Sequence, residues 1–560
     1  MKKINSTIIT AIILICSACN YLDFDETNKL NTKEDIYSYF NTTKTMLTHI
    51  YSYIPQDFGI IGGAMRECGS DDAEFGNTGA DIQFYNNDSW SATKTIDNNW
   101  NLYKGIRAAN SFIEEIAKVD FSRFEHNNSY EEWMSQLSYF PYEARLLRAF
   151  FFFELAKRYG DIAMPLTVLS TEEANTIHKT SFQDVVKFIV EECDSCTKYL
   201  PVSYANISPK ETGRVTKGFA MGLKSKTLLY AASPLHNPNM DVELWKKSAK
   251  AAYELIQTGY YSLETENVNN LNSKEVVLFR MNPQDYTFEL NNFPLRFVNG
   301  KRNTLSNSIF PSQNLVDAFE TENGYSVTLT DNGWISEDPA FNPSKPYEHR
   351  DSRFYKTILY NGANFKNSTI EVFAGGLDSK PVAEGGSPTG YFLRKYIQEV
   401  TSFETDKEVK ALHHWIVYRY AETLLSYAES MIQAFGAPDY TDNEFTMSAR
   451  EALNQVRDNA GMPPVKANSK EEFIKALQNE WRVEFAFEDH RFWDIRRWKI
   501  GEETQKQLYG VSIFKSTDNS FQYQKTLYET RSWSEKKYLY PIPQAELYNN
   551  TNLMPQNQGW

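Results

Sequence analysis

Four carboxylates crowd one short segment near the N-terminus and are the best candidates for acid–base chemistry. Glu67, Asp71, Asp72 and Glu74 all lie within residues 67–74. Two carboxyls at a defined separation can act as general acid and base, and a larger group can hold a cation. Acidic residues in such a segment also form turns and loop hydrogen bonds, and we favour that structural interpretation.

A second charged cluster lies near the C-terminus. It mixes carboxylates, arginines and aromatic rings, namely Glu484, Phe487, Glu488, Arg491, Phe492, Trp493, Asp494, Arg496, Arg497 and Trp498. Forked guanidinium groups beside carboxylates and ring faces are typical of a buried ion-pair lattice. A catalytic carboxylate pair is the alternative. We favour the lattice because paired charges mostly organise structure.

Cysteine and histidine spacings give little support to redox or metal chemistry. Cys193 and Cys196 have CxxC spacing, but they end a helical pattern with no strand before them, so we expect helix-surface or core thiols. His413 and His414 are adjacent and would point to different faces of a helix. The chain has no HExxH, phosphate-binding loop, GxSxG, or GxGxxG after a strand, and we predict no catalytic residue, metal or cofactor.

Composition limits the class of partner. Of the 560 residues, 41% are apolar and 23% charged, which excludes a disordered chain. The net charge of −14 argues against a basic nucleic-acid-binding surface and against recruitment to anionic lipid by charge. Aromatic residues reach 14%, and surplus Tyr and Trp suit exposed contact surfaces.

The N-terminus has the pattern of an export signal that ends at a cysteine. Lys2 and Lys3 precede an apolar run over 8–15, which is too short to span a bilayer as a helix. Small residues then precede Cys19, as in a bacterial lipobox. We predict a lipoprotein signal peptide at 1–18 and a lipidated Cys19 that begins a tether over 19–32. A plain cleaved export signal is the alternative.

Helical periodicity dominates most of the remaining chain. Apolar residues from Phe182 to Cys193 fall on one helix face after a plausible N-cap, Ser181. The stretch 415–434 repeats this pattern, and Gly436 ends it. Further helices are expected at 33–53, 98–117, 141–158, 216–232, 243–257, 447–459 and 470–488. Small residues beside bulky aromatics in these segments are typical of the helix hairpins of tetratricopeptide (TPR) repeats. The prediction is a mainly α, TPR-like scaffold with a few short strands.

Two segments, 62–97 and about 260–400, lack helical periodicity. Asn, Gly and aromatic residues alternate in both, as in 282–288 and 331–336. Long loops inside a compact protein are usually functional or disordered, and the aromatics argue against disorder. We therefore expect the helical scaffold to carry two aromatic, Asn-rich loop regions.

The ordered motifs along the chain resemble the SusD/RagB family of Bacteroidota outer-membrane lipoproteins. The motifs that carry the resemblance are Trp100–Asn110, Glu143–Phe150 with Tyr159–Asp161, Gly213–Lys217, Leu228–Pro234, Pro311–Phe319, Arg350–Arg353, Arg419–Glu422, Arg482–Trp498, Tyr540–Pro543 and Gln556–Trp560. The resemblance implies one SusD-like domain over 33–560, with a TPR-like half at about 33–260 and a loop-rich and helical half at about 261–560. The acidic segment 20–26 likewise resembles a signal for export to the cell surface in such lipoproteins.

The resemblance also implies a function: non-catalytic capture of a glycan and its delivery to a TonB-dependent barrel of the SusC type. Lipid on Cys19 would anchor the chain to the outer membrane. An extracellular glycoside hydrolase on a helical scaffold, or a TPR-like protein scaffold, are the alternatives.

Aromatic faces that stack on sugar rings and polar groups that bond their hydroxyls should lie in the two loop regions. The candidate aromatic contacts are Trp90 and Trp334 above all, then Phe75, Tyr85, Tyr286 and Phe293. The candidate polar contacts are Arg66, Asp72, Asn86 and Asn87.

Overall fold

The computed structural model describes residues 32–265, 270–379 and 386–560. The predicted signal peptide, Cys19 and all of the predicted tether except residue 32 lie outside the described residues. The longer helices are α3 (Phe40–Tyr51), α5 (Leu102–Ile116), α7 (Phe140–Tyr159), α9 (Phe182–Cys196), α10 (Lys217–Ala232), α11 (Val242–Gln257), α15 (Tyr420–Phe435), α16 (Ala449–Asn459) and α17 (Lys470–Glu484). The shorter helices are α2 (Lys33–Tyr37), α4 (Gln83–Asn86), α6 (Tyr130–Leu137), α8 (Thr171–Ala174), α12 (Thr287–Asn292), α13 (Gln313–Ala318), α14 (Ser352–Thr357), α18 (Arg491–Arg497), α19 (Gly501–Thr504) and α20 (Gln544–Asn549).

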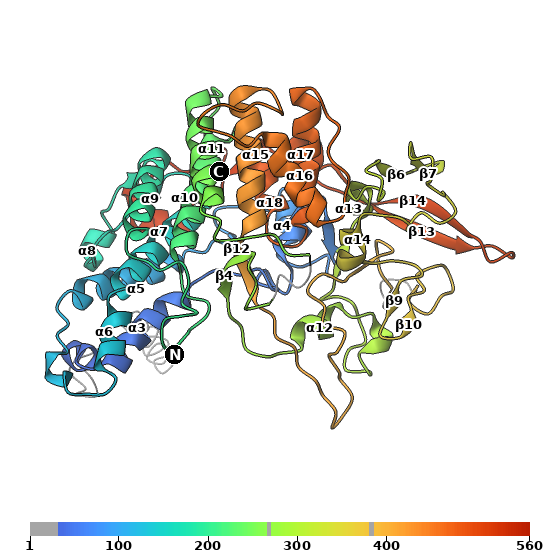
Figure 1. Cartoon of the computed structure of the whole chain (residues 1–560). Helices are drawn as coiled ribbons and strands as arrows, with labels where there is room; N and C mark the ends of the chain where they lie inside the picture. The colour runs from blue at the N-terminus through green and yellow to red at the C-terminus, as the bar shows by residue number, and fades with distance from the viewer. Residues whose placement is uncertain (1–31, 266–269, 380–385) are drawn as a thin grey trace, which may run out of the picture.

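The longer helices pack side by side in a row that forms the scaffold. Helix α5 packs on α7, α7 on α9, α9 on α10, α10 on α11, α11 on α15, and α15 on α16 and α17 (Figure 1). The α11–α15 contact buries Ala249, Ala252 and Ala428, and Tyr253 stacks on Tyr427 with ring centroids 5.2 Å apart. Small residues thus let the helices approach beside large rings, as the sequence predicted. The mainly α, TPR-like architecture is confirmed.

Most helix boundaries follow the local capping signals. The Ser181 side chain accepts from the main-chain N–H of Asp184 at the start of α9. Gly436 ends α15 in the left-handed conformation, at φ 75°. Three expected boundaries were wrong. Residues 415–419 are not helical, because they form strand β12 and pair with β4, and the expected helices 98–117 and 470–488 begin four residues later (α5) and end four residues earlier (α17). The expected helix over 33–53 divides into α2 and α3.

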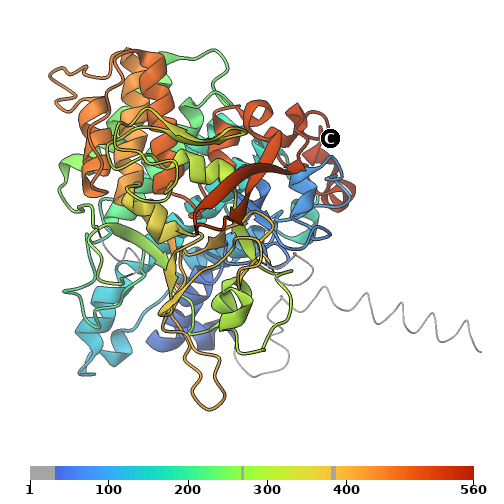
Figure 2. The ribbon, with the colours of Figure 1, turned by 90° about the vertical axis from the view of Figure 1, so that its right-hand side faces the viewer.

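In the described residues, every strand pairs with one antiparallel partner. The pairs are β1 (Ala73–Phe75) with β5 (Ile309–Pro311), β2 (Ile162–Ala163) with β3 (Lys179–Thr180), β4 (Val276–Arg280) with β12 (Trp415–Arg419), β6 (Val327–Thr330) with β7 (Gly333–Ser336), β8 (Ile358–Leu359) with β11 (Phe392–Leu393), β9 (Asn364–Phe365) with β10 (Ser368–Thr369), and β13 (Gln507–Lys515) with β14 (Phe521–Thr530). Figure 2 looks onto this strand- and loop-rich side, where the red β13–β14 hairpin crosses in front. The β1–β5 pair joins the two loop regions that are far apart in sequence.

The N-terminal carboxylate cluster is part of the structural core. Asp71 accepts two hydrogen bonds of 2.8 Å from Arg491, and Asp72 accepts one of 2.6 Å from Arg482. Glu74 pairs with Arg531 at 2.8 Å, and both are buried. These bonds tie the segment 67–74 to the C-terminal part of the chain, which confirms the structural interpretation.

The C-terminal charged cluster forms the predicted ion-pair lattice. The buried Arg419 guanidinium bonds to Glu275, Glu484 and Glu488 over 2.6–2.8 Å. Lys395 adds a fourth contact, on Glu488 at 2.7 Å. The lattice thus joins the β4–β12 pair to the end of α17.

The two CxxC cysteines are free and buried at the end of α9. Burial raises the pKa of the Cys196 thiol to about 12. A low pKa is what makes a thiol reactive, so these are core residues, as expected.

Candidate functional site

Eight of the ten side chains expected to contact a ligand are buried. They are Arg66, Asp72, Phe75, Tyr85, Asn86, Trp90, Phe293 and Trp334. Trp90 is 1% exposed and Trp334 is 4% exposed, so neither offers a ring face to a ligand. The expectation that these two tryptophans form the binding platform is corrected by this burial.

The C-terminal segment explains why Trp90 is buried. Its ring lies edge-on to Tyr85 at 4.9 Å, to Tyr540 at 4.8 Å and to Trp560 at 4.8 Å between centroids. Polar, turn-rich flanking residues suggested an exposed tryptophan, but two of the rings that cover it, Tyr540 and Trp560, come from more than 400 residues away. Trp334 is covered similarly, by Tyr347 at 5.7 Å.

The other buried candidates have structural partners. Phe293 packs against Phe365 at 5.0 Å, and Arg66 forms an ion pair with Asp97 at 2.7 Å. The Asn86 amide donates to the main-chain oxygen of Cys68 at 3.0 Å. The side-chain groups that were expected to contact a sugar are therefore occupied by contacts within the protein.

Only Tyr286 and Asn87 remain partly or fully exposed. The Asn87 side-chain oxygen accepts from the main-chain N–H of Ser89 at 2.9 Å, within its own turn. Tyr286 lies between Asp285 and Thr287, both of which line a groove. Of the ten candidates, Tyr286 is therefore the one that leads to the site described next.

This groove consists of two adjoining hollows that share Asn282 and Pro283, and we refer to it as the loop groove. Their volumes are about 560 and 360 Å³. Helix α3, the start of α7, the loop 211–214 and the end of β4 line the larger hollow. The smaller hollow lies between residues 56–63 and α12, with His413 at one side. Grooves of this size accommodate small-molecule ligands.

Aromatic rings form the wall of the smaller hollow. Phe58 and Phe288 are half-buried, with ring centroids 5.3 Å apart and planes at 66°. Tyr396 and Trp415 support Phe58 from behind, edge-on at 4.9 and 5.0 Å. A ring that is fixed from behind and open on one side can stack against an apolar ligand face.

Amide groups stand beside these rings. The Asn282 amide donates to Gln56 at 2.7 Å and to the main-chain oxygen of His413 at 3.0 Å, and the residue lines both hollows. The Asn291 side chain has no hydrogen-bond partner among the described residues and also lines the hollow. An amide both donates and accepts, which suits the hydroxyls of a sugar.

Short helix α12 holds Phe288 and Asn291 in place. Buried Asn292 donates to the main-chain oxygen of Phe288 and accepts from the N–H of Ile309, both at 2.9 Å. Buried Glu289 accepts from the main-chain N–H of Gln398 and contacts His413 at 2.8 Å. The groove is therefore preformed rather than dependent on a ligand to order it.

Paired charges line the larger hollow. Arg214 forms ion pairs with Glu143 and, at 3.3 Å, with Glu211, and Lys44 contacts Glu211 at 2.6 Å. The Tyr51 hydroxyl donates to Glu143 at 2.5 Å. Burial, followed by the Glu143 charge, raises the pKa of Tyr51 well above its ordinary value. The carboxylates of Glu143 and Glu211 are therefore paired with cations, Arg214 and Lys44, that line the same hollow.

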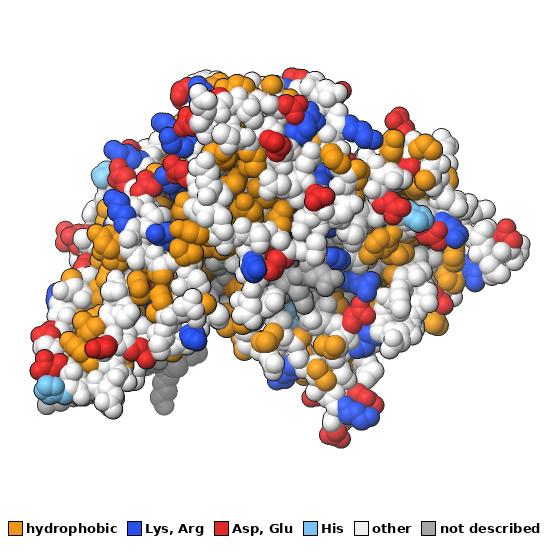
Figure 3. All heavy atoms as spheres, viewed as in Figure 1, with side chains coloured by type: hydrophobic (Ala, Val, Ile, Leu, Met, Phe, Trp, Pro, Cys, Tyr) orange, Lys and Arg blue, Asp and Glu red, His pale blue; other side chains and the backbone are white. Residues whose placement is uncertain are grey.

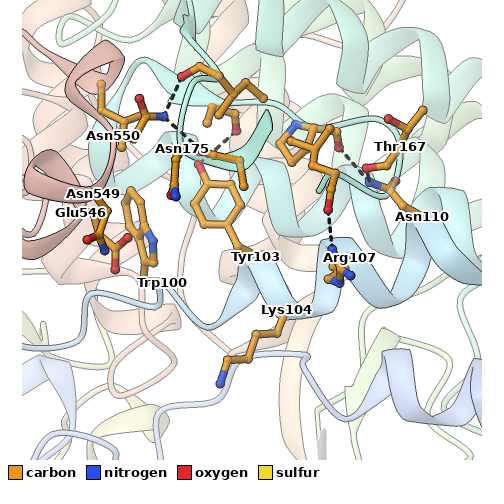
Figure 4. A pocket seen from close by; sticks show the side chains of 16 residues that line it. Trp100, Tyr103, Lys104, Arg107, Asn110, Thr167, Asn175, Glu546, Asn549 and Asn550 are labelled. Atoms are coloured by element: carbon orange, nitrogen blue, oxygen red, sulfur yellow. Dashed lines mark hydrogen bonds between the residues drawn. The ribbon is translucent and has the colours of Figure 1, made fainter. Parts of the chain in front are cut away.

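Another hollow, of about 310 Å³, lies between α5 and the C-terminal segment (Figure 4). Trp100 and Tyr103 line it with ring centroids 4.9 Å apart. Several of its polar groups, however, are bonded to main-chain carbonyls: Tyr103 to Ala163 at 3.0 Å, and Asn110 to Pro165 at 3.0 Å. These bonds hold neighbouring segments together, so the loop groove is the stronger candidate site.

Sequence patterns indicated the groove only in part. The stretch 282–288 was identified as an aromatic, Asn-rich loop, and it lines the groove through Asn282 and Phe288. Phe58, Gln56 and Asn291 were missed. Gln56 and Phe58 precede the first loop region, and the contact that makes Phe58 part of a site is with α12.

Within the described residues, no group of three or more His, Cys, Asp or Glu side chains is arranged to hold a metal ion. In the same part of the chain, no helix is long and apolar enough to cross a membrane. Figure 3 shows acidic and basic side chains interspersed over the face that it draws.

A helical-hairpin scaffold that carries a loop-borne groove defines a class of ligand-binding protein, and comparison with known proteins gives the family. Residues 269–560 match the model of the SusD family, and residues 20–229 match a model described as starch-binding associating with outer membrane. The chain belongs to the SusD family. The resemblance inferred from the sequence motifs is thereby confirmed.

Solved structures of similar proteins support the fold. A SusD-like protein from Bacteroides fragilis is 27% identical, with a TM-score of 0.76 over 95% of this chain and 99% of that one. A SusD-like carbohydrate-binding protein from the same organism is 24% identical, with a TM-score of 0.71 over 93% of this chain and 100% of that one. A laminarin-binding SusD-like protein is 20% identical, with a TM-score of 0.58 over 93% of this chain and 99% of that one.

Among curated proteins, SusD-like protein P2 of Formosa agariphila is 29% identical over 158 residues. The match spans 26% of each chain. One of the solved relatives is described as carbohydrate-binding and another as laminarin-binding, and the family model matched by residues 20–229 is described as associating with the outer membrane.

Proposed function

We propose that this protein binds oligo- or polysaccharide at the cell surface, without cleaving it, and delivers it to a SusC-like TonB-dependent transporter. The observation that supports the binding step is the loop groove, in which the open faces of Phe58 and Phe288 adjoin the free amide of Asn291. Rings that stack and amides that bond hydroxyls are the groups that a sugar requires. The carbohydrate-binding relatives support the same ligand class.

The position of the groove is consistent with delivery from a tethered protein. Helix α3 follows α2, where the described chain begins, and it forms one wall of the groove through Lys44, Leu47 and Tyr51. A tether over 19–32 would therefore join the described chain directly before α2 and α3, the helix that lines the groove. Such a tether raises the effective concentration of the site near a membrane partner.

Calorimetric titration of a form that starts at Asn20, against a panel of neutral and acidic oligo- and polysaccharides, tests the binding step. We expect dissociation constants between micromolar and millimolar, about −8 to −4 kcal/mol. Thin-layer chromatography of the same mixtures tests for cleavage, and product formation would favour the hydrolase alternative.

Substitutions locate the site. Phe288→Ala and Asn291→Ala should each weaken binding at least fivefold, about 1 kcal/mol. The control is Phe514→Ala, because Phe514 is 45% exposed on β13 and lies outside the groove lining. Loss of binding in the control, or unchanged binding in both groove variants, would refute the groove as the site.

Membrane attachment and the partner need a separate experiment. We expect labelled fatty acid to be incorporated into the wild type but not into Cys19→Ala. Affinity purification from detergent-solubilised outer membranes should recover a TonB-dependent barrel in a defined stoichiometry. A protein that carries no lipid and elutes alone from these membranes would contradict the delivery step.

A further inference from the structure

Arg280 lines the larger hollow of the loop groove, two residues before Asn282, which lines both hollows. It is the last residue of β4 and pairs with Trp415 across the β4–β12 ladder. Its side chain lines the larger hollow, and the next residues, Met281 to Pro283, continue along the same wall. The ladder fixes the main chain, so the guanidinium group starts from a rigid base.

Most hydrogen-bonding capacity of Arg280 is unused. A guanidinium group has five N–H donors. In the described part of the chain, Arg280 donates one hydrogen bond, to the main-chain oxygen of Ile54, and it has no carboxylate partner. Partial burial lowers the pKa of Arg280, with no acid nearby to offset the effect.

Two other arginines without a carboxylate partner, Arg350 and Arg302, are engaged more fully. Arg350 donates to four main-chain oxygens, those of Val316, Phe319, Glu320 and Pro346. Arg302 donates to the main-chain oxygens of Asn291 and Phe293 and to Ser308. The free donors of Arg280, which lie in a groove, are not explained by a similar structural role.

The carboxylates of the groove leave room for a ligand anion. Arg214 and Lys44 pair with Glu143 and Glu211. Asp285 accepts from two main-chain N–H groups at the start of α12, at 2.6 and 3.1 Å. The carboxylates near an oxyanion bound to Arg280 would therefore already be paired with cations or with main-chain N–H groups, which reduces their repulsion of the ligand.

We propose that the loop groove takes saccharides that carry an oxyanion, either a uronic acid carboxylate or a sulfate ester, and that Arg280 binds this group. The planar fork of a guanidinium matches two oxygens of such a group at once, and the charge strengthens both bonds. The inference rests on the proposed saccharide-binding function and specifies its substrate class. The rings of Phe58 and Phe288 would stack on the sugar, and Arg280 would favour a sugar that carries a negative charge.

Matched saccharide pairs provide the test, with titration as the measurement. The probes are oligogalacturonides with their carboxyl-reduced forms, and carrageenan oligosaccharides with their desulfated forms; the first pair reports on carboxylate, the second on sulfate. We expect an acidic member of at least one pair to bind at least tenfold tighter than its neutral counterpart. Arg280→Gln should remove that preference, and Arg280→Lys should retain part of it.

Controls separate this inference from the proposed function. Arg123→Gln serves as the matched variant, because Arg123 is exposed, also donates to one main-chain oxygen, that of Ser38, and lies outside the groove. Equal binding of acidic and neutral members, or a preference that survives Arg280→Gln, would overturn the inference. If neutral sugars bind and Phe288→Ala weakens them, the proposed function stands and only the acidic preference fails. If no member of either pair binds, the acidic preference is overturned. If no saccharide of the whole panel binds, the proposed function is refuted as well.

Discussion

Trp90 gives the sharpest test of how this structure assigns roles, because sequence patterns place it in the ligand site and the structure places it in the core. The ring is 1% exposed and has three aromatic neighbours, each within 4.9 Å between centroids. Truncation of a buried Trp or Phe to Ala costs about 3–5 kcal/mol. Each edge-to-face pair that is lost adds to the area term, so Trp90→Ala should lie toward the upper end of this range.

Urea denaturation, followed by near-ultraviolet circular dichroism, measures the loss. Trp90→Phe should lose less free energy of unfolding than Trp90→Ala, because an aromatic ring remains between Tyr85 and Tyr540. Asn87→Ala, in the exposed turn nearby, should unfold like the wild type within about 0.5 kcal/mol. A stable Trp90→Ala protein that no longer binds saccharide would refute the assignment of Trp90 to the core and restore it to the site.

Three further predictions concern the core. Arg419→Gln should cost about 3–5 kcal/mol in the free energy of unfolding, since the carboxylates of Glu484 and of buried Glu275 and Glu488 lose their shared cation; denaturant titration measures it. Burial lowers the pKa of His236 from 6.5 to about 3, so the unfolded chain takes up a proton first as pH falls below 6.5. Stability should therefore decline between pH 6.5 and 3 in the wild type and decline less in His236→Phe, as shown by thermal unfolding across that range. Cys196 and the other buried thiols should react with a disulfide reagent only after unfolding, and fast labelling of the native protein would contradict their burial.

Local signals determined much of the helical scaffold from sequence alone. The face from Phe182 to Cys193, the cap at Ser181 and the end at Gly436 are all encoded within a few turns, and all were predicted correctly. The strand β12 was missed because its partner, β4, lies more than 130 residues earlier in the chain. Periodicity cannot identify a pairing of that range.

Site prediction was limited by the same lack of long-range information. Composition correctly indicated where aromatic loops occur, but exposure depends on which distant ring covers which. Trp90 is covered by Trp560 and Tyr540, whereas Phe288 has one open side beside Phe58. Flanking residues look equally polar in both cases, so the buried and the accessible ring could not be told apart.

The polar core has a consequence for binding in the loop groove. Helix α12 has six residues, too short to be stable alone in water. It is held by buried Asn292 and Glu289, which bond to Ile309 and Gln398 on other segments. A ligand that meets Phe288 and Asn291 therefore need not order the loop that carries them, and the conformational entropy that often weakens loop-borne sites is already lost on folding. Affinity in this groove should thus depend on the rings, amides and charge that face the sugar, which is why single substitutions there can identify the ligand class.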